Sequence, residues 1–201
     1  MVIRPSTIPI FLNNKILKNR INNNMRCGSY TISAITKQCK DSAGGVKCVY
    51  IADADAVSAV TVDTTAETIT NIAMSGSSKF AKWEFAVNTA TYTNTGNISE
   101  ENQTLYFQND VALAFTQMEK VKRLQILAAT VGNTVVVVKD ANNHLWYLGY
   151  DNPVSATAIG GEAGQAMGDR NGYTITLTDY SKALPMELEM TAENLTAIGI
   201  D

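Results

Sequence analysis

Histidine is almost missing from this sequence, and charged side chains are sparse. The 201 residues include one histidine, and Asp, Glu, Lys and Arg together make up 17% of them, which is below the quarter typical of soluble domains. No apolar run reaches the roughly eighteen residues that a membrane-spanning helix needs. The apolar patch Ile8–Leu12 is too short for a signal-peptide core. The sequence therefore argues against helical membrane spans, and we expect synthesis in the cytoplasm.

Cysteine is too scarce for a disulfide framework. The chain has Cys27, Cys39 and Cys48, twelve and nine residues apart, with no CxxC pair, and its one histidine is His144. A zinc site needs three or four ligands, and these spacings match no familiar zinc module. A nucleophilic site needs a base within reach of Ser or Cys, and His144 falls in an expected hairpin turn. We expect the cysteines to be reduced structural thiols.

Two further motifs resemble ligand sites without completing one. The sequence around Asp53, Asp55 and Asp63 does not contain the glycine and the terminal glutamate that a calcium-binding loop requires. These aspartates fit solvated turns or strand edges better. The stretch "GGEAGQAMGDRNGYTITLTDY" from Gly160 to Tyr180 lacks the Lys and Ser or Thr of a phosphate-binding loop, and a strand pattern follows it instead of a helix. We predict no catalytic, cofactor-binding or metal-binding residue, and no enzyme activity.

The first 24 residues differ from the rest of the chain. They contain no acid, six asparagines and four basic residues, namely Arg4, Lys15, Lys18 and Arg20. One interpretation of residues 1–24 is a translated leader before a natural start at Met25. The other is a flexible basic arm that orders against an assembly partner or nucleic acid. Without this segment 12 basic residues stand against 19 acidic ones, a net charge of about −7, so residues 25–201 form an acidic body.

Alternation of apolar and polar residues with a period of two runs through that body and predicts half-buried strands. The clearest case is "YTITLTDY", in which Tyr173, Ile175 and Leu177 oppose three threonines. "KWEFAVN" likewise predicts one face made of Trp83, Phe85 and Val87. The other candidate strands are residues 30–35, 49–53, 59–63, 110–115 and 185–190, and residues 134–150 are expected to form a hairpin with a buried first strand.

One helix is expected after these early strands. Thr116 and Glu119 have capping-box spacing, and the helix is predicted to end near Gly132. Its apolar face is predicted to contain Met118, Val121, Leu124 and Ala128. Many short strands and one helix indicate a mainly β fold, a β-sandwich or barrel with one packed α-helix, as a single domain over residues 25–201.

Three stretches carry a family resemblance: "TLYFQNDVALAFTQMEKVKRLQILAA", "VVVVKDANNHLWYLGY" and "GGEAGQAMGDRNGYTITL". The chain resembles the tail-tube and related virion structural proteins of tailed bacteriophages and prophages, particularly those of Bacteroidetes hosts. The similarity covers Cys27 to Met190 and is strongest from Thr104 to Leu177. The leader has no counterpart in the family's pattern.

The resemblance implies a structural protein of the virion tail, made in the cytoplasm of the host bacterium. Six copies would close into a ring, and stacked rings would form a passive conduit for DNA ejection, without sequence-specific binding of the DNA in the lumen. Other tail or connector proteins would be further partners. An acidic wall suits this role because it repels phosphates. The glycines from Gly160 to Gly172 would let a connection reach along a neighbouring subunit, or else form a simple surface hairpin.

Two alternatives remain open at the level of sequence. Another virion protein, such as a head–tail ring, a tail hub or a capsid decoration protein, would show the same composition. A carbohydrate-binding β-sandwich would need an exposed aromatic platform, for which Trp83, Trp146 and Tyr147 are the candidates.

Overall fold

The structure is a computed structural model that describes residues 32–37 and 39–199. The chain divides into two units, Met1–Ala34 and Ile35–Asp201. The predicted leader, residues 1–24, and Cys27 lie outside the described residues. Residues 32–35, the described part of the first predicted strand, are exposed and form no strand. That prediction was wrong for these residues, since no described strand pairs with them. All helices and strands described below belong to the second unit.

The larger of two β-sheets has seven strands in the order β2-β3-β11-β8-β7-β1-β4. Its central strands β1, β7 and β8 pair antiparallel, and β11 pairs parallel with β3. The strand bounds are β1 Val46–Asp53, β2 Val57–Asp63, β3 Thr68–Met74, β4 Ala81–Trp83, β7 Thr134–Asp140, β8 Leu145–Leu148 and β11 Met186–Leu188. The predicted 134–150 hairpin is confirmed as β7, β8 and the turn between them.

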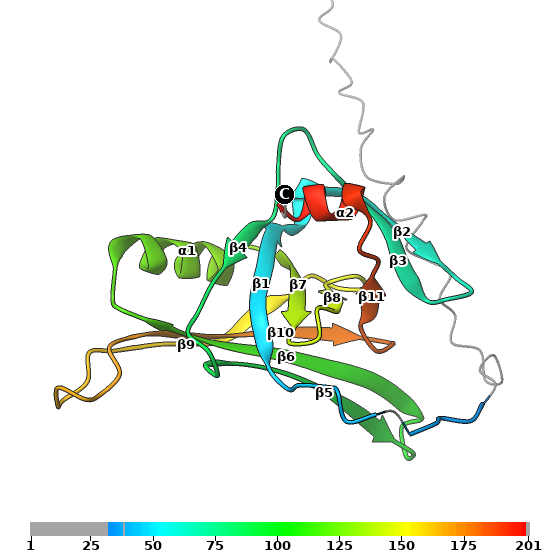
Figure 1. The fold of residues 1–201 in the computed structure, drawn as a ribbon, viewed down its shortest axis with the longest axis horizontal. Coiled ribbons are helices and arrows are strands. Elements are labelled where there is room, and N and C mark those ends of the chain that lie inside the picture. The colour runs from blue at the N-terminus through cyan, green and yellow to red at the C-terminus, as the bar shows by residue number, and fades with distance from the viewer. Residues whose placement is uncertain (1–31, 38, 200–201) are drawn as a thin grey trace, which may run out of the picture. The chain divides into compact units, whose positions relative to one another are not determined.

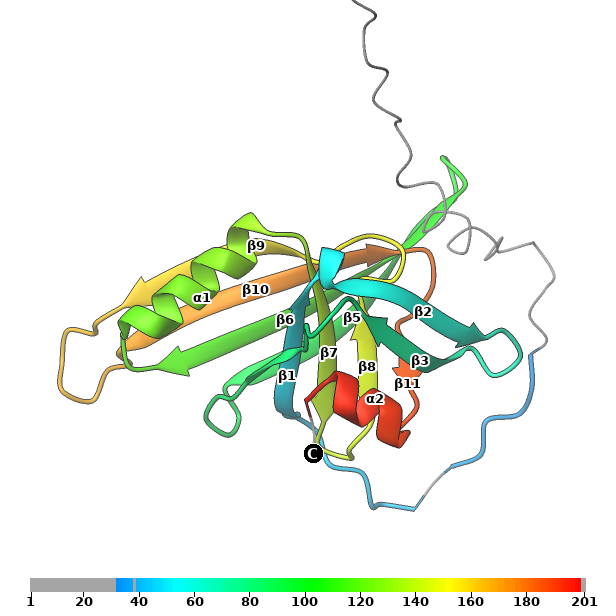
Figure 2. The ribbon, with the colours of Figure 1, turned by 90° about the horizontal axis from the view of Figure 1, so that it is seen from above.

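The smaller sheet has four long antiparallel strands in the order β5-β6-β10-β9. It lies beneath the larger sheet, and the strands of the two sheets cross steeply (Figure 1, Figure 2). Its strands are β5 Ala90–Ser99, β6 Thr104–Thr116, β9 Ser155–Glu162 and β10 Gly172–Ser181. Both sheets are open, so the mainly β prediction is confirmed as a sandwich and not a closed barrel.

Two hydrophobic cores flank the seven-stranded sheet. The first lies between the sheets, where Val49 and Val136 face Leu113 and Ile175. The second lies on the other face of the larger sheet and includes Tyr50, Val137, Ile69, Leu188 and Ile198. Because β1 and β7 contribute to both cores, each contains a continuous apolar run, residues 48–52 and 135–138, as expected for strands covered on both faces.

Three helical segments complete the fold: η1 Ala54–Ala56, a 3-10 turn, and the α-helices α1 Lys120–Val131 and α2 Ala192–Ala197. Helix α2 was not predicted. It packs on β3, and the buried Asn194 side chain accepts a 3.0 Å hydrogen bond from the Ile72 amide and donates to the Thr70 and Glu189 carbonyls, each at 2.9 Å. Thr191 caps this helix by accepting from the Asn194 amide.

Helix α1 ends at the predicted place, before Gly132, but the predicted start and buried face were wrong. Thr116 is the last residue of β6 and pairs with Gly172, so it cannot cap the helix. Glu119 occupies the cap position without a side-chain hydrogen bond to the backbone. The helix buries Ile126 and Ala129 against the smaller sheet, whereas the predicted face is exposed: Met118, Val121, Leu124 and Ala128.

The "KWEFAVN" strand was also only partly predicted. Strand β4 ends at Trp83, whose ring lies edge-on to Phe115 at a centroid distance of 5.5 Å. Phe85 packs on the same core, but Val87 is 87% exposed and lies outside any strand. In contrast, β10 follows its prediction, with Ile175 and Leu177 buried and its threonines on the other face.

Candidate functional site

The two free edges of the four-stranded sheet are the most distinctive surface of the described residues. Strand β5 pairs only with β6, and β9 pairs only with β10. Neither edge strand contains proline, lysine or arginine, and the one charged residue in them is Glu162, which pairs with Arg170 at 2.6 Å. Natural edge strands are usually protected by such residues or by bulges. These two edges therefore remain able to accept another strand.

The edges of the seven-stranded sheet are shorter or more irregular than those of the smaller sheet. Strand β4 has three residues, and the β2–β3 pairing shifts register twice. Short and bulged edges are poor templates for another chain. By comparison, β5 keeps an unbroken register with β6 from Ala90 to Ser99, and β9 has a single irregularity beside Thr176. Long, regular pairing geometry is thus kept at the two edges of the smaller sheet.

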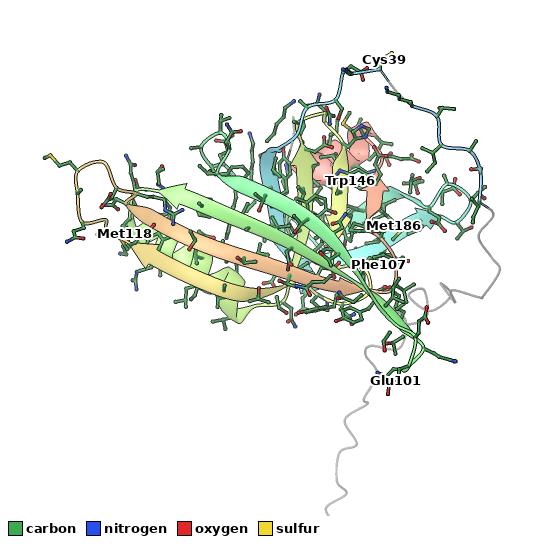
Figure 3. The ribbon with its side chains drawn as sticks, turned by 90° about the horizontal axis from the view of Figure 1, so that it is seen from below. Cys39, Glu101, Phe107, Met118, Trp146 and Met186 are labelled. Carbon is green, nitrogen blue, oxygen red and sulfur yellow. The ribbon has the colours of Figure 1, made fainter. Side chains whose placement is uncertain are left out.

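The outer face of the smaller sheet carries mostly uncharged side chains, many of them threonine or alanine, and the exposed Tyr106 and Tyr180 rings lie on it. One row across the four strands reads Thr91, Ala112, Thr176 and Ala158, as the strand registers show. None of the four strands contains lysine, arginine or histidine. Figure 3 looks onto this face from below. The four strands thus place no basic side chain on this face, and the cation beside it, Arg170 of the β9–β10 loop, is paired with Glu162.

Two carboxylates lie on this outer face, Glu162 and Asp110. Glu162 pairs with Arg170, and hydrogen bonds occupy Asp110. Asp110 Oδ1 accepts from Thr178 Oγ1 at 2.6 Å, and its Oδ2 accepts from Gln108 Nε2 at 2.9 Å. The Thr157 and Thr178 hydroxyls are 2.9 Å apart. This network links β9, β10 and β6 across the outer face, and it orients the side chains there without presenting a catalytic group.

A second polar group lies on the inner face of the same sheet and was missed in the sequence. Asp179 and Asn109 are both buried, and Asn109 Nδ2 donates to Asp179 Oδ2 and to Ser181 Oγ, each at 3.0 Å. Burial raises the pKa of Asp179 to about 6, although the hydrogen bond from Asn109 opposes the shift. The sequence does contain a signal for this. Asp179 follows Tyr173, Ile175 and Leu177 at every second position of "YTITLTDY", so it belongs to the strand face that is turned to the core. The pair joins β6 to β10.

The glycine-rich stretch from Gly160 to Gly172 forms the β9–β10 hairpin. Gly160 and Gly161 lie in β9 and Gly172 begins β10, while Asp169 Oδ2 accepts from the Gln165 and Ala166 amides in the loop, at 2.8 and 2.7 Å. A Cβ at Gly172 would lie 1.8 Å from the Phe115 carbonyl oxygen. Glycine is therefore required there for close strand pairing, and a reach toward a neighbouring subunit stays a prediction.

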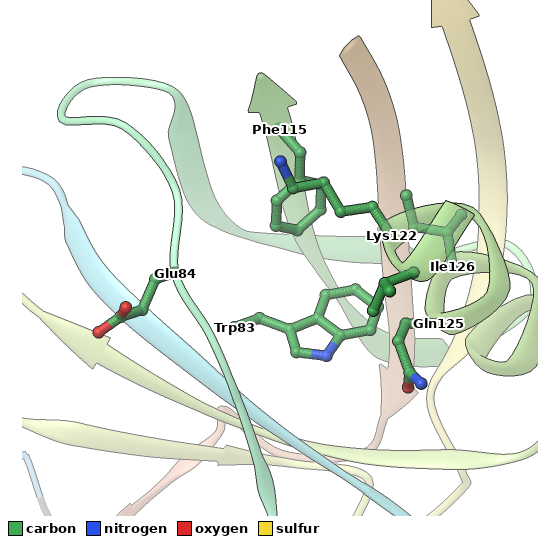
Figure 4. A pocket seen from close by; sticks show the side chains of 7 residues that line it. Trp83, Glu84, Phe115, Lys122, Gln125 and Ile126 are labelled. Atoms are coloured by element: carbon green, nitrogen blue, oxygen red, sulfur yellow. The ribbon is translucent and has the colours of Figure 1, made fainter. Parts of the chain in front are cut away.

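A shallow, mostly apolar hollow lies between β4 and α1. The Trp83 ring, Phe115 and Ile126 form its floor, and Glu84 points away from it (Figure 4). Its one cation, Lys122, donates to the Thr116 carbonyl at 2.7 Å and lies 3.6 Å from the Glu119 carboxylate. The other side chains that line the hollow are apolar except for Glu84 and Gln125, so its geometry suggests packing and not chemistry.

The residues considered for catalysis or zinc binding lie in separate environments. His144 is in the β7–β8 turn, with its Nδ1 2.6 Å from Glu187 Oε1, and this hydrogen bond raises the pKa of the imidazole. Cys48 is buried in the second core, and Cys39 is exposed before β1. Across residues 32–37 and 39–199, no three His, Cys, Asp or Glu side chains cluster in a way that could hold a metal ion.

The three aspartates considered for calcium binding belong to different structural elements. Asp53 ends β1, Asp55 is in the 3-10 turn and Asp63 ends β2. Asp63 Oδ1 accepts from the Thr65 and Ala66 amides at 2.7 and 3.3 Å, which lowers the pKa of the Asp63 carboxyl. The prediction of a solvated turn residue is confirmed for Asp63.

The three aromatic residues considered as a carbohydrate platform do not share one surface. Trp146 packs against the core between the sheets, whereas Tyr147, its neighbour in β8, is buried in the second core. Trp83 is partly buried against Phe115. Because Trp146 and Tyr147 point to opposite faces of the larger sheet, they cannot stack on one sugar together.

No described helix is long and apolar enough to span a membrane. Comparisons of the chain with protein-family models, with curated proteins and with solved structures find no match.

Proposed function

We propose that this chain is a virion structural protein whose copies join through the edges of their four-stranded sheets into rings, and that the rings stack as the tail tube of a tailed bacteriophage. The observation that carries the proposal is a sheet with two long edges and four strands that contain no basic residue. The sequence resemblance of residues 104–177 supports the same assignment.

The two edges can pair with each other between copies. An exposed edge presents unpaired N–H and C=O groups that another strand can satisfy. Since β5 and β9 are different surfaces of one molecule, joining β5 of one copy to β9 of the next is a head-to-tail contact. Such contacts form a closed ring when the rotation from one subunit to the next adds up to a full turn. The resemblance suggests six copies per ring.

In the proposed ring the outer face of the smaller sheet lines the passage. Its inner face is covered by the larger sheet and α1. In a ring of joined copies, the larger sheet and α1 would therefore lie on the outside, and the uncovered face would be turned to the ring axis. Lysine and arginine on that wall would bind phosphates and release counterions. Their absence leaves a wall along which DNA passes without being held, and no enzyme activity is required.

A test of the proposal is to place lysine on the edges, as natural edge strands do. The variants Thr93→Lys in β5 and Ala158→Lys in β9 each add a charge at an exposed edge position. Sedimentation velocity of the full chain should show large ring-sized species for the wild type and for Thr64→Lys, a control in the exposed β2–β3 turn. Both edge variants should sediment as smaller species. Equal assembly of all four proteins would overturn edge pairing.

A further inference from the structure

Helix α1 has an apolar face that the fold leaves uncovered. Its inner side buries Ile126 and Ala129, and its outer side exposes Leu124, Leu127 and Val131, the last at 82%. With Lys120, these outer residues follow the spacing of one helical stripe, and Arg123 lies beside Leu127. Among the described residues, neither Lys120 nor Arg123 takes part in an ion pair. The outer side of α1 is thus an apolar stripe with a basic border.

The tip of the β5–β6 hairpin has a matching surface of opposite charge. Ile98 and Leu105 are cross-strand partners, and both are exposed, Ile98 at 75%. The turn that follows them contains Glu100 and Glu101, both exposed. In the described part of the chain these two carboxylates take part in no ion pair. The hairpin tip therefore combines an apolar pair with an acidic border.

These two surfaces cannot meet within one molecule. The hairpin tip and α1 lie at opposite ends of the second unit in all three ribbon views (Figure 1, Figure 2, Figure 3), with Glu101 at one end and Met118, next to α1, at the other. Both surfaces expose aliphatic side chains, and their borders carry opposite charges. Each is therefore complementary to the other on a second copy.

We propose that the β5–β6 hairpin of one copy docks on the outer face of α1 of another copy, with Ile98 and Leu105 against Leu124 and Leu127 and with Glu100 and Glu101 beside Lys120 and Arg123. The segment outside the described residues that is long enough to compete, residues 1–31, contains no acid. Its positive charge would be repelled by Lys120 and Arg123, so charge favours the hairpin.

This contact rests on the proposed self-assembly and adds a second direction to it. Edge pairing of β5 with β9 extends a sheet perpendicular to its strands, whereas the hairpin projects along the strands (Figure 2, Figure 3). Edge pairing builds the ring, and hairpin docking joins one ring to the next. Glu100, Glu101, Lys120 and Arg123 lie outside β5 and β9, so substitutions there can disrupt docking without touching the paired edges.

A charge-swap experiment on the full chain tests the docking. The double variants Glu100→Lys/Glu101→Lys and Lys120→Glu/Arg123→Glu each place like charges together, and the quadruple variant restores opposite charges. Circular dichroism and thermal unfolding should match the wild type, because all four side chains are exposed. Electron microscopy should show single rings for each double variant and stacked rings for the wild type and the quadruple variant. The concentration needed for stacking should rise about tenfold or more in each double variant.

The other results are equally informative. Stacking that is unchanged in both double variants, or lost in the quadruple variant, overturns the docking while rings remain as evidence for edge pairing. A second variant, Leu124→Asn, should also weaken stacking without abolishing rings, since it removes apolar contact and leaves the charges in place. A wild-type protein that forms no ring at any concentration contradicts the proposed function and the docking together.

Discussion

Asn109 Nδ2 donates a 3.0 Å hydrogen bond to Asp179 Oδ2, and this contact links the two central strands of the four-stranded sheet, β6 and β10, from the inner side. Both side chains are almost completely buried. A carboxylate in such a place is costly to ionise, because water no longer solvates the charge. The sheet proposed to build the ring therefore contains a titratable group in its interior.

Replacing Asp179 with Asn should change how stability depends on pH. Burial, together with the nearby Asp151 carboxylate, raises the pKa of Asp179 to about 6, whereas an unfolded aspartate titrates near about 3.9. The stabilisation from the extra proton is full below about pH 4 and is lost as pH rises through about 6. In urea titrations, the free energy of unfolding of Asp179→Asn relative to wild type should increase by roughly 2–3 kcal/mol between pH 4 and pH 7.5. An identical difference at both pH values would contradict the buried carboxyl.

Adding one methyl group at Gly172 should be severely destabilising. The new Cβ would lie 1.8 Å from the Phe115 carbonyl oxygen, so β6 and β10 could not keep their pairing. We expect Gly172→Ala to lower the free energy of unfolding by about 3 kcal/mol or more. Gly168→Ala is the matched control, because a Cβ there has no neighbour within 4 Å. Urea titration of the two variants should separate them, and equal stability would rule out the close approach of the strands.

The single histidine reports on the contact between the β7–β8 turn and β11. His144 Nδ1 lies 2.6 Å from Glu187 Oε1, and this hydrogen bond raises the pKa of His144. The stabilisation is therefore present below the unfolded pKa of the imidazole and is lost as pH rises through the folded pKa. Glu187→Gln should lower the pKa of His144 in an NMR titration, where one imidazole gives one signal. No change in the titration midpoint would show that the pair is not formed in solution.

Lysine on the outer face of the smaller sheet should convert a passive wall into one that binds DNA. Thr176 lies on a central strand, away from both edges, so Thr176→Lys should leave ring formation intact. Assembled Thr176→Lys should bind a short duplex in a fluorescence anisotropy assay, and the binding should weaken steeply between about 50 and 200 mM salt. Thr64→Lys, with its charge on the other sheet, should bind no more DNA than wild type. Binding by the control alone would place the passage elsewhere.

Strand periodicity was the part of the sequence that predicted structure best. Strands β6 and β10 meet a core on one face, and their sequences alternate between apolar and polar residues. Strand β7 meets a core on both faces and is continuously apolar from Val135 to Val138. That signal is local, so it can be read without knowing the fold. The "KWEFAVN" pattern has the same alternation, but its last residues have no neighbouring strand, and Val87 is exposed as a result.

The buried side of α1 could not be derived in the same way. The helix offers two apolar faces, one containing Leu124 and the other containing Ile126, and only packing against the smaller sheet selects Ile126. The start of the helix was mispredicted because β6 extends through Thr116 to pair with Gly172, a contact between residues far apart in sequence. The free sheet edges are also a property of topology, which no local pattern contains.

Negative-stain electron microscopy of the purified full chain at high concentration tests the central claim most directly. The account predicts rings of uniform diameter with a central hole, stacking into tubes, and single or smaller species for Thr93→Lys under the same conditions. A wild-type protein that remains a lone particle at every concentration would contradict it.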